Sequence, residues 1–507
     1  MNWGRTSGVL LHITSLPGRY GIGELGPEAL RFADWLAEGG QRVWQILPLG
    51  PVGYGESPYQ VYSAFAGNSL LISIDTLVER GWLSARDIGR VPRFAPGRVE
   101  FERVIPWKTN LLHRAFRTFR EQAGAADRDL FKKFHEENCW WLDDYARFMA
   151  LKERHYNAVW TAWDRSAAPL EDDAQYHQFV QFEFFREWDA LRKYCADRQI
   201  HLMGDLAIYV AHDSADVFTH PDLFKLDDSG APIAVAGVPP DYFSETGQLW
   251  GNPIYRWDRM AATGFRWWVD RMRVALRMFD AVRMDHFRGF EAYWEVPAQE
   301  ATAVNGRWVK GPGSELFRAL EEQLGPLPLV AENLGMITPE VEALRDEFGF
   351  PGMAVLQFAF GTDAQALGFR PHRYVKNLVA YTGTHDNDTA NGWWRSQGGD
   401  STRTPQDIEE ERERARAYLG TDGRRMNWVL IRNLIMSGAD TVLYPMQDVL
   451  GLGGEARMNT PATPKGNWRW RCRAEALNSE LAARLRRMAE LYERTGASPA
   501  PLSSTLS

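Results

Sequence analysis

Eight short apolar segments recur along the chain, and aliphatic and β-branched residues dominate them. They are residues 8–13, 42–48, 201–206, 281–285, 328–332, 354–358, 378–382 and 441–444. Each is an almost continuous hydrophobic run, without the apolar–polar alternation of a half-exposed strand. Such runs are typical of parallel strands that are buried on both faces. The pattern therefore predicts a sheet of eight parallel strands.

Helical segments with recognisable ends lie between several of these strands. Pro27 stands at a first helical position, and Gly39 follows the end of that helix. Residues 265–279 and 338–349 are predicted to form two further helices. Strands that alternate with helices form βαβ units. Eight such units predict an α/β fold, a (β/α)8 TIM barrel.

The spacing of the strands predicts large insertions in one catalytic domain, residues 1–495. We expect residues 51–199 to form a mainly helical subdomain between the second and third strands, and residues 209–264 to form a loop-rich insertion. The segment after Met446 is short and has a helical pattern, which leaves no room for a C-terminal β-sandwich domain. Residues 496–507 are rich in Ser, Pro and Ala and are expected to be disordered.

The charge balance excludes two classes of partner. The chain has 58 basic and 66 acidic residues and a net charge of −8, so no basic excess is available for a nucleic-acid backbone. No apolar run approaches the roughly 18 residues of a membrane span. We therefore expect neither a nucleic acid nor a membrane as partner.

The cysteines indicate a reducing compartment. Cys139, Cys195 and Cys472 are far apart in the sequence and form no C-x-x-C pair, which argues against a disulfide scaffold and a thiolate zinc site. The N-terminal apolar run is short and interrupted by His12, so it is read as a strand rather than as a signal peptide. The expected location is the cytoplasm.

Acidic residues follow four of the predicted strands. Asp205, Asp285, Glu332 and Asp386 stand at the carboxyl ends of the third, fourth, fifth and seventh strands. A single acid there is readily explained as a helix N-cap or a solvated loop residue. Catalytic groups of TIM barrels, however, come from this rim. Four acids on one rim therefore predict a catalytic site.

Several carboxylates without a thiol nucleophile, a phosphate loop or a serine elbow indicate the cleavage of glycosidic bonds. One carboxylate attacks the anomeric carbon, and a second, protonated one donates to the leaving oxygen. Arg283 can keep the nucleophile ionised, while His286 and His385 offer donors for sugar hydroxyls. The high aromatic content, 13% with 21 tryptophans, suits sugar stacking as well as core packing.

Two motifs that would indicate other functions, a dinucleotide site and a calcium site, match this sequence only in part. Residues 21–26 match G-x-G-x-x-G, but the loop from the preceding strand is too long for a dinucleotide turn, and no ribose-binding acid closes the second strand. Residues 386–388 resemble the start of a calcium loop but lack its glycine and glutamate. We expect neither a cofactor nor a metal.

Seven stretches make the sequence recognisable: residues 7–17, 53–60, 237–244, 248–253, 283–289, 381–387 and 457–461. With these motifs the chain resembles the amylomaltases, which are 4-α-glucanotransferases or disproportionating enzymes of the α-amylase superfamily. The resemblance covers nearly the whole chain, and the seven stretches together are highly specific.

The resemblance implies a role for each matching position. Asp285 would be the nucleophile, Glu332 the general acid/base and Asp386 the stabiliser of the transition state. The substrate-binding positions would be Tyr54, Ser57, Tyr59, Asp205, Gln248, Trp250, Asn252, Arg283, His286, Asp363, His385 and Asn459. Among them, Tyr54 matches a second glucan contact outside the cleft, and Trp250 belongs to a loop that covers it.

The sequence departs from the family pattern at three positions. Asn333 stands where many relatives carry Asp. The loss of this negative charge is expected to alter either the pKa of Glu332 or a contact to the acceptor, compared with those relatives. Ala462 replaces a common glycine and puts the local turn in question. Met284 replaces isoleucine, which is a mild apolar exchange.

The predicted activity is the transfer of α-1,4-glucan segments between donor and acceptor glucans by a retaining double displacement, with possible cyclic products. Glucose would be the smallest acceptor, and the protein is expected to be a monomer. Residues 242–250 are expected to shield the intermediate from water. The alternatives are an α-amylase-like retaining hydrolase and a glucan-binding protein without catalysis.

Overall fold

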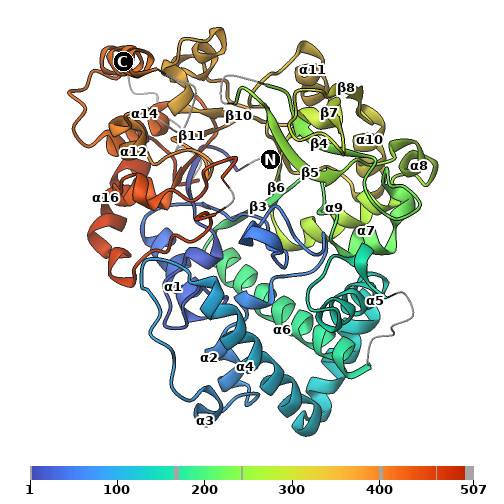
Figure 1. The fold of residues 1–507 in the computed structure, drawn as a ribbon. Coiled ribbons are helices and arrows are strands. Elements are labelled where there is room, and N and C mark those ends of the chain that lie inside the picture. Colours follow the sequence, from blue (N-terminus) through green and yellow to red (C-terminus); the bar gives the residue numbers. More distant parts are fainter. Residues whose placement is uncertain (1–2, 165–170, 241–243, 399–403, 464, 497–507) are drawn as a thin grey trace.

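The computed structural model describes residues 3–164, 171–240, 244–398, 404–463 and 465–496, with the side chains of Tyr54 and Ala364 left out. Eight parallel strands form a barrel in the order β10-β11-β12-β1-β2-β3-β6-β9 (Figure 1). Their bounds are β1 Thr6–Leu10, β2 Val43–Gln45, β3 His201–Leu206, β6 Ala281–Met284, β9 Leu329–Ala331, β10 Gly352–Val355, β11 Leu378–Tyr381 and β12 Thr441–Pro445. Between the first and last strands of this order, the amide of Ala331 donates to the carbonyl of Pro351 at 2.9 Å. All eight predicted strands are confirmed, each within a few residues of its expected bounds.

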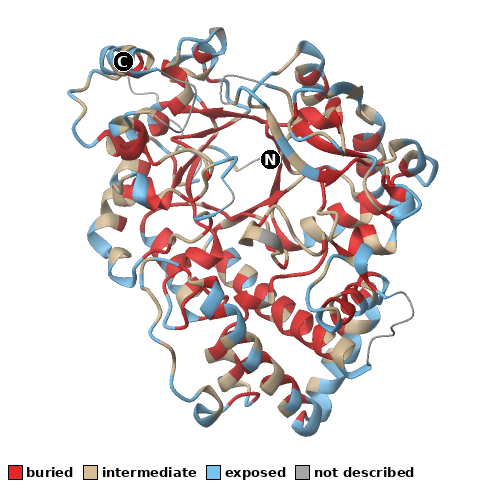
Figure 2. Ribbon diagram, viewed as in Figure 1, coloured by how far each residue is buried: buried red, intermediate tan, exposed pale blue. Residues whose placement is uncertain are grey.

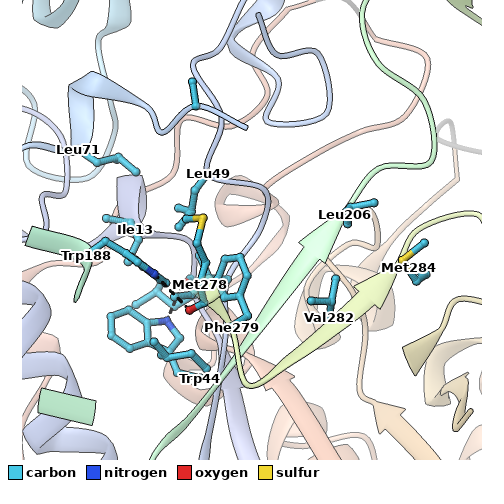
Figure 3. Close-up of a cluster of buried hydrophobic side chains, with 14 of the residues drawn as sticks. Ile13, Trp44, Leu49, Leu71, Trp188, Leu206, Met278, Phe279, Val282 and Met284 are labelled. Atoms are coloured by element: carbon cyan, nitrogen blue, oxygen red, sulfur yellow. Dashed lines mark hydrogen bonds between the residues drawn. The ribbon is translucent and has the colours of Figure 1, made fainter. Parts of the chain in front are cut away.

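The strands divide the core into an inner and an outer layer. Eight buried side chains from six strands share one cluster: Val43, Met203, Val330, Met353, Val355, Val379, Tyr381 and Leu443. The larger cluster lies between the strands and the helices, where Trp44 and Trp188 donate to the carbonyls of Leu11 and Met278 (Figure 3). The barrel strands are accordingly buried except for the half-buried first residues of β3 and β11, whereas the outer helices expose one face (Figure 2).

Helices connect the strands around the outside of the barrel. The predicted helices are present as α1 Pro27–Glu38, α9 Arg266–Met278 and α11 Pro339–Glu347. The others in this layer are α10 Ser314–Leu324, α12 Ala390–Arg395, α13 Pro405–Leu419, α14 Met426–Met436, α15 Met446–Leu450 and α16 Ser479–Leu491. Within the described ranges, the chain after β12 contains helices and turns but no named strand.

Helices also fill the long connection between β2 and β3. They are α2 Ile74–Glu79, α3 Ala85–Ile88, α4 Phe101–Gln122, α5 Ala125–Arg154 and α6 Glu171–Ala196. They lie together on one side of the barrel (Figure 1). None of the described helices combines the length and apolar composition needed to cross a bilayer.

A second sheet forms beside the barrel, and the sequence pattern did not predict it. It is antiparallel, with the order β5-β4-β7-β8. Its strands are β4 Ala234–Val238, β5 Gln248–Pro253, β7 Ala292–Pro297 and β8 Arg307–Lys310, and short helices α7 Ala215–Thr219 and α8 Trp257–Ala262 flank the first two. The segment 209–264, expected to be loop-rich, thus contributes two strands. These strands are short, and β4 pairs with β7 from far along the chain, so no local period indicates them.

Candidate active site

The four predicted acids meet at the carboxyl ends of the barrel strands. Asp205 belongs to β3, and Asp285 and Glu332 directly follow β6 and β9. The parallel register brings Asp205 opposite Arg283 and Arg283 opposite Val330, so these neighbouring strands deliver their acids to one rim. Asp386 reaches the same rim from the loop after β11.

Arg283 links two of the acids. Its Nη1 donates to both carboxylate oxygens of Asp205 at 2.8 Å, and its Nη2 lies 2.9 Å from Oδ1 of Asp285. Burial opposes the charge of Arg283, but both carboxylates raise its pKa well above the ordinary value. The Asp285 side chain, which is 27% exposed, thus lies directly against a fixed positive charge.

Glu332 lies in a different environment from Asp285. It is 9% exposed, and its two oxygens accept the backbone amides of His286 and Leu334, each at 2.8 Å. Burial raises the pKa of Glu332 to about 7; the charge of Asp285 adds to the rise, and Arg283 opposes it. Near neutral pH this carboxyl group can therefore hold a proton or release it, as a general acid/base must.

Asp386 is held by groups from the C-terminal part of the chain. Asn459 Nδ2 donates to Asp386 Oδ1 at 2.6 Å, and His385 Nε2 lies 3.4 Å from the same oxygen. Arg457 donates to the backbone carbonyl of Asp386 at 2.8 Å and to that of Asn459. The carboxylate remains 45% exposed, so it is free to meet a substrate.

Tyr59 brings the helical insertion into the site. Its hydroxyl donates to Asp205 Oδ2 at 2.9 Å, and its ring stacks on His385 with centroids 5.1 Å apart. The ring of Trp468 lies 5.9 Å from Tyr59 and 5.8 Å from His385. Ser57 Oγ accepts the amide of Tyr59 at 3.2 Å and so fixes the turn. The three rings thus form an aromatic cluster beside the acids, with Trp468 tilted against the other two.

The second sheet brings strand β5 to the same rim. Trp250 Nε1 donates to Gln248 Oε1 at 3.2 Å, and the indole meets His286 edge-on with centroids 4.8 Å apart. Asn252 Oδ1 accepts Gln60 Nε2 at 3.0 Å, which ties β5 to the loop that carries Tyr59. Burial lowers the pKa of His286 to about 4, so its ring is neutral beside Asp285.

Two predicted binding residues are not joined to this cluster by the described contacts. Asp363 caps a short 3-10 turn by accepting the amides of Gln365 and Ala366. The side chain of Tyr54 lies outside the described part of the structure, as do residues 241–243 of the cleft loop. The role of these residues in binding stays a prediction.

Four residues of the site were missed by reasoning from the sequence. Gln60, Arg457 and Trp468 were given no role, although each contacts a predicted site residue. His12 was read only as an interruption of a strand, yet it is buried near His385, and burial lowers its pKa to about 3. A signal existed for His12, because it closely follows a barrel strand as the acids do.

The structure explains two departures from the family pattern. Asn333 points away from the acids: its amide nitrogen donates to Glu342 Oε1, and its oxygen accepts the amide of Met353, both at 2.8 Å. It therefore joins β9 to β10 rather than contacting Glu332. Ala462 adopts φ +61°, a left-handed conformation that favours glycine.

Known proteins are similar to this chain in sequence and fold. The family model described as 4-alpha-glucanotransferase matches residues 11–477. The 4-alpha-glucanotransferase of Thermus thermophilus is 49% identical over 97% of this chain and 99% of the relative, and that of Synechocystis sp. is 49% identical over 97% and 98%. The solved amylomaltase from Streptococcus agalactiae in complex with acarbose is 38% identical, with a TM-score of 0.90 over 97% of this chain and 99% of that one.

Proposed function

This chain belongs to the 4-alpha-glucanotransferase family, and we propose that Asp285, Glu332 and Asp386 carry its transfer reaction. One observation supports this assignment most strongly. A half-buried carboxylate paired with Arg283 stands beside a buried carboxyl group of pKa about 7. That pair matches what a retaining double displacement requires.

In the first step, an oxygen of Asp285 attacks the anomeric carbon of the donor glucan. The glycosidic bond breaks as Glu332 gives its proton to the leaving 4-oxygen, so the released chain carries a hydroxyl group. The glucan segment is then an ester of Asp285, and Glu332 is a carboxylate. Arg283 now has a charged partner only in Asp205. It stabilises the neutral ester of Asp285 less than it stabilises the ionised Asp285 carboxylate, so the ester remains reactive.

In the second step, Glu332 takes the proton from the 4-hydroxyl of an acceptor glucan. That oxygen attacks the anomeric carbon, the ester bond breaks, and Asp285 regains its negative charge. Two inversions restore the α configuration. Glu332 is again protonated, so the cycle closes without a cofactor.

The other residues of the cluster bind the sugar at the reacting bond. Asp386 is proposed to stabilise positive charge on the ring in the transition state, with Asn459 orienting its carboxylate. Tyr59 offers its ring to the apolar face of the sugar, and its bond to Asp205 fixes the angle of that ring. His385 offers a ring nitrogen to a hydroxyl group.

Transfer is faster than hydrolysis only if water is excluded from the ester intermediate. We propose that the β5 segment provides this cover, because Trp250 lies against His286, directly beside Asp285. Residues 242–250 would hold the acceptor sugar while they exclude water. Gln248, Trp250 and Asn252 would contact that acceptor.

Several finer properties complete the proposal. Glucose is proposed as the smallest acceptor, the cytoplasm as the location and a monomer as the functional form. Residues 1–495 would act as one catalytic domain with insertions at 51–199 and 209–264. Tyr54, Ser57 and Asp363 would make further contacts to glucan.

Incubation with maltotriose tests the reaction, and Asp285→Asn tests the nucleophile. The wild-type enzyme should give glucose and longer chains with a nearly constant number of reducing ends, whereas a hydrolase would increase that number.

Asp285→Asn should lower turnover by roughly 10³-fold or more with an unchanged circular dichroism spectrum. Asp189→Asn, an exchange of a surface residue on α6, is the matched control and should retain full activity. Retained turnover in Asp285→Asn would remove this residue from the role of nucleophile.

A further inference from the structure

A basic hollow lies on the outer side of the barrel, apart from the catalytic rim. It has a volume of ≈ 590 Å³ and lies where α12, the start of α14, the loop after α15 and α16 approach one another (orange and red in Figure 1). Its lining is made of Asn391, Trp394, Arg395, Gly423, Arg424, Arg425, Asn427, Trp428, Gly451 and Arg484. Within the described ranges, four arginines and no carboxylate line it.

The positive charge of this hollow is concentrated and poorly compensated. Arg484 is half-buried, and its pKa is lowered by burial and by the charges of Arg425 and Arg487. Arg424 has an acidic partner, Asp422, at 3.5 Å, but this ion pair is exposed. In a protein with a net charge of −8, like charges gathered in one hollow are unfavourable unless an anion offsets them.

Two indole rings form the sides of the hollow. The guanidinium carbon of Arg484 lies 3.6 Å from the ring centroid of Trp428, which holds both groups in place. Trp394 packs on Gly423, where an added Cβ would come within 2.5 Å of the indole. The stacked pair of Arg484 and Trp428 is pre-organised, so little conformational entropy of these two side chains is lost when a ligand binds.

The base of the hollow is rigid and polar. Asn391 donates to the carbonyl of Gly451 at 2.8 Å and accepts the amide of Asn427, whose side chain donates to the carbonyl of Asp448 at 2.8 Å. These bonds connect α12, α14 and the loop after α15. The volume lies within the range of small-molecule sites.

We propose that this hollow is a binding site for a sugar phosphate, with the phosphate on Arg425 and Arg484 and the sugar ring on Trp428 or Trp394. Arginine forks match phosphate oxygens in geometry and charge, and an indole face matches the apolar face of a pyranose. The phosphate can belong to a free sugar phosphate or to a phosphate ester on a glucan chain. The inference is independent of the roles proposed for Asp285 and Glu332.

Calorimetric titration of the full-length protein tests the site. Glucose 6-phosphate should bind at least ten-fold more tightly than glucose or inorganic phosphate, because only it uses both arginines and a ring. Raising sodium chloride from about 0.05 M to about 0.5 M should weaken binding several-fold, since exposed charges are then screened. A phosphorylated maltooligosaccharide that binds more tightly than glucose 6-phosphate would identify the glucan ester as the source, and the reverse order the free sugar phosphate.

The double variant Arg425→Gln/Arg484→Gln localises the site. It should weaken binding of glucose 6-phosphate by ten-fold or more while it converts maltotriose at the wild-type rate, which shows that it folds. The matched control Arg90→Gln changes an exposed arginine elsewhere on the surface and should bind like the wild type. Unchanged affinity in the double variant, or equal affinity for glucose, for inorganic phosphate or for adenosine monophosphate, would overturn the proposal.

Discussion

At the scale of single residues, two carboxyl groups of the site lie in different environments. Asp285 faces the rim and pairs with Arg283, whereas Glu332 is buried under backbone amides. The pKa of Glu332 rises to about 7 because burial penalises its charged form more than Arg283 favours it. These surroundings suit the proposed roles, with Asp285 as the nucleophile and Glu332 as the proton carrier.

This difference predicts how activity depends on pH. Glu332 must be protonated to assist the leaving group, and it loses that proton as the pH rises through about 7. We expect kcat/KM for maltotriose to fall about ten-fold per pH unit on the alkaline side. Initial rates at low donor concentration between pH 5 and 9, roughly, measure this limb. A flat profile up to the upper limit would contradict the assignment of Glu332 as the acid.

At the scale of elements, strand β5 is the segment that we propose to shield the intermediate from water. Its residues alternate, so that Trp250 lies against His286 while its neighbour Leu249 is exposed. The bond between Asn252 and Gln60 holds the strand near the loop of Tyr59. A strand anchored in this way can cover the rim without blocking it permanently.

We expect Trp250→Ala to increase the share of hydrolysis in the reaction with maltotriose several-fold. The smaller side chain opens a path for water to the ester of Asp285. The ratio of new reducing ends to transferred chains measures the effect. Ile233→Ala, which shortens an exposed side chain just before β4 of the same sheet, is the matched control and should leave the ratio unchanged. An unchanged ratio in Trp250→Ala would mean that this segment does not exclude water.

The turn at Ala462 gives a prediction about stability. Its φ of +61° disfavours any residue with a Cβ. Ala462→Gly is therefore expected to raise the free energy of unfolding by about 0.5–1 kcal/mol. The control Ala483→Gly, in the interior of α16, should lower it by about 0.5–1 kcal/mol. Chemical denaturation of both variants measures these changes, and a loss of stability in Ala462→Gly would show that the turn is not strained.

At the scale of the whole molecule, buried ion pairs join the barrel to the helical insertion. Lys108 of α4 is fully buried and pairs with Glu24, which follows β1 and also accepts the amide of Ile74. Nearby, Glu187 of α6 accepts the amide of Ser73 at 2.8 Å. Burial disfavours the charged form of each of these side chains, so each charged group is stabilised in the core by its neighbours of opposite charge and by hydrogen bonds.

Removing one partner of this buried pair should destabilise the molecule. Lys108→Met leaves Glu24 without its counter-charge and is expected to cost about 3–5 kcal/mol of stability. The control Lys132→Met breaks an exposed pair with Glu136 and should cost less than about 1 kcal/mol. The midpoint of thermal unfolding measures both. The double variant Lys108→Met/Glu24→Gln should recover part of the loss, and a variant Lys108→Met as stable as wild type would contradict this view.

Much of the barrel could be predicted from local sequence. Segments such as 201–206 and 378–382 are almost continuous apolar runs, and such composition is typical of strands that are buried on both faces. The second sheet could not be predicted in this way. In β8, Arg307–Lys310, three of four residues are exposed, and its partner β7 defines it as a strand.

By itself, the sequence determined the barrel class, the four strand-end acids and the family to which the chain belongs. Apolar strand segments and sequence motifs consist of neighbouring residues, so both can be recognised without knowledge of the three-dimensional structure. Tertiary structure decided the environment of each acid: that Arg283 reaches Asp205 and Asp285, and that Glu332 is buried. A pKa depends on what surrounds a group in space, and most of those neighbours come from distant parts of the chain.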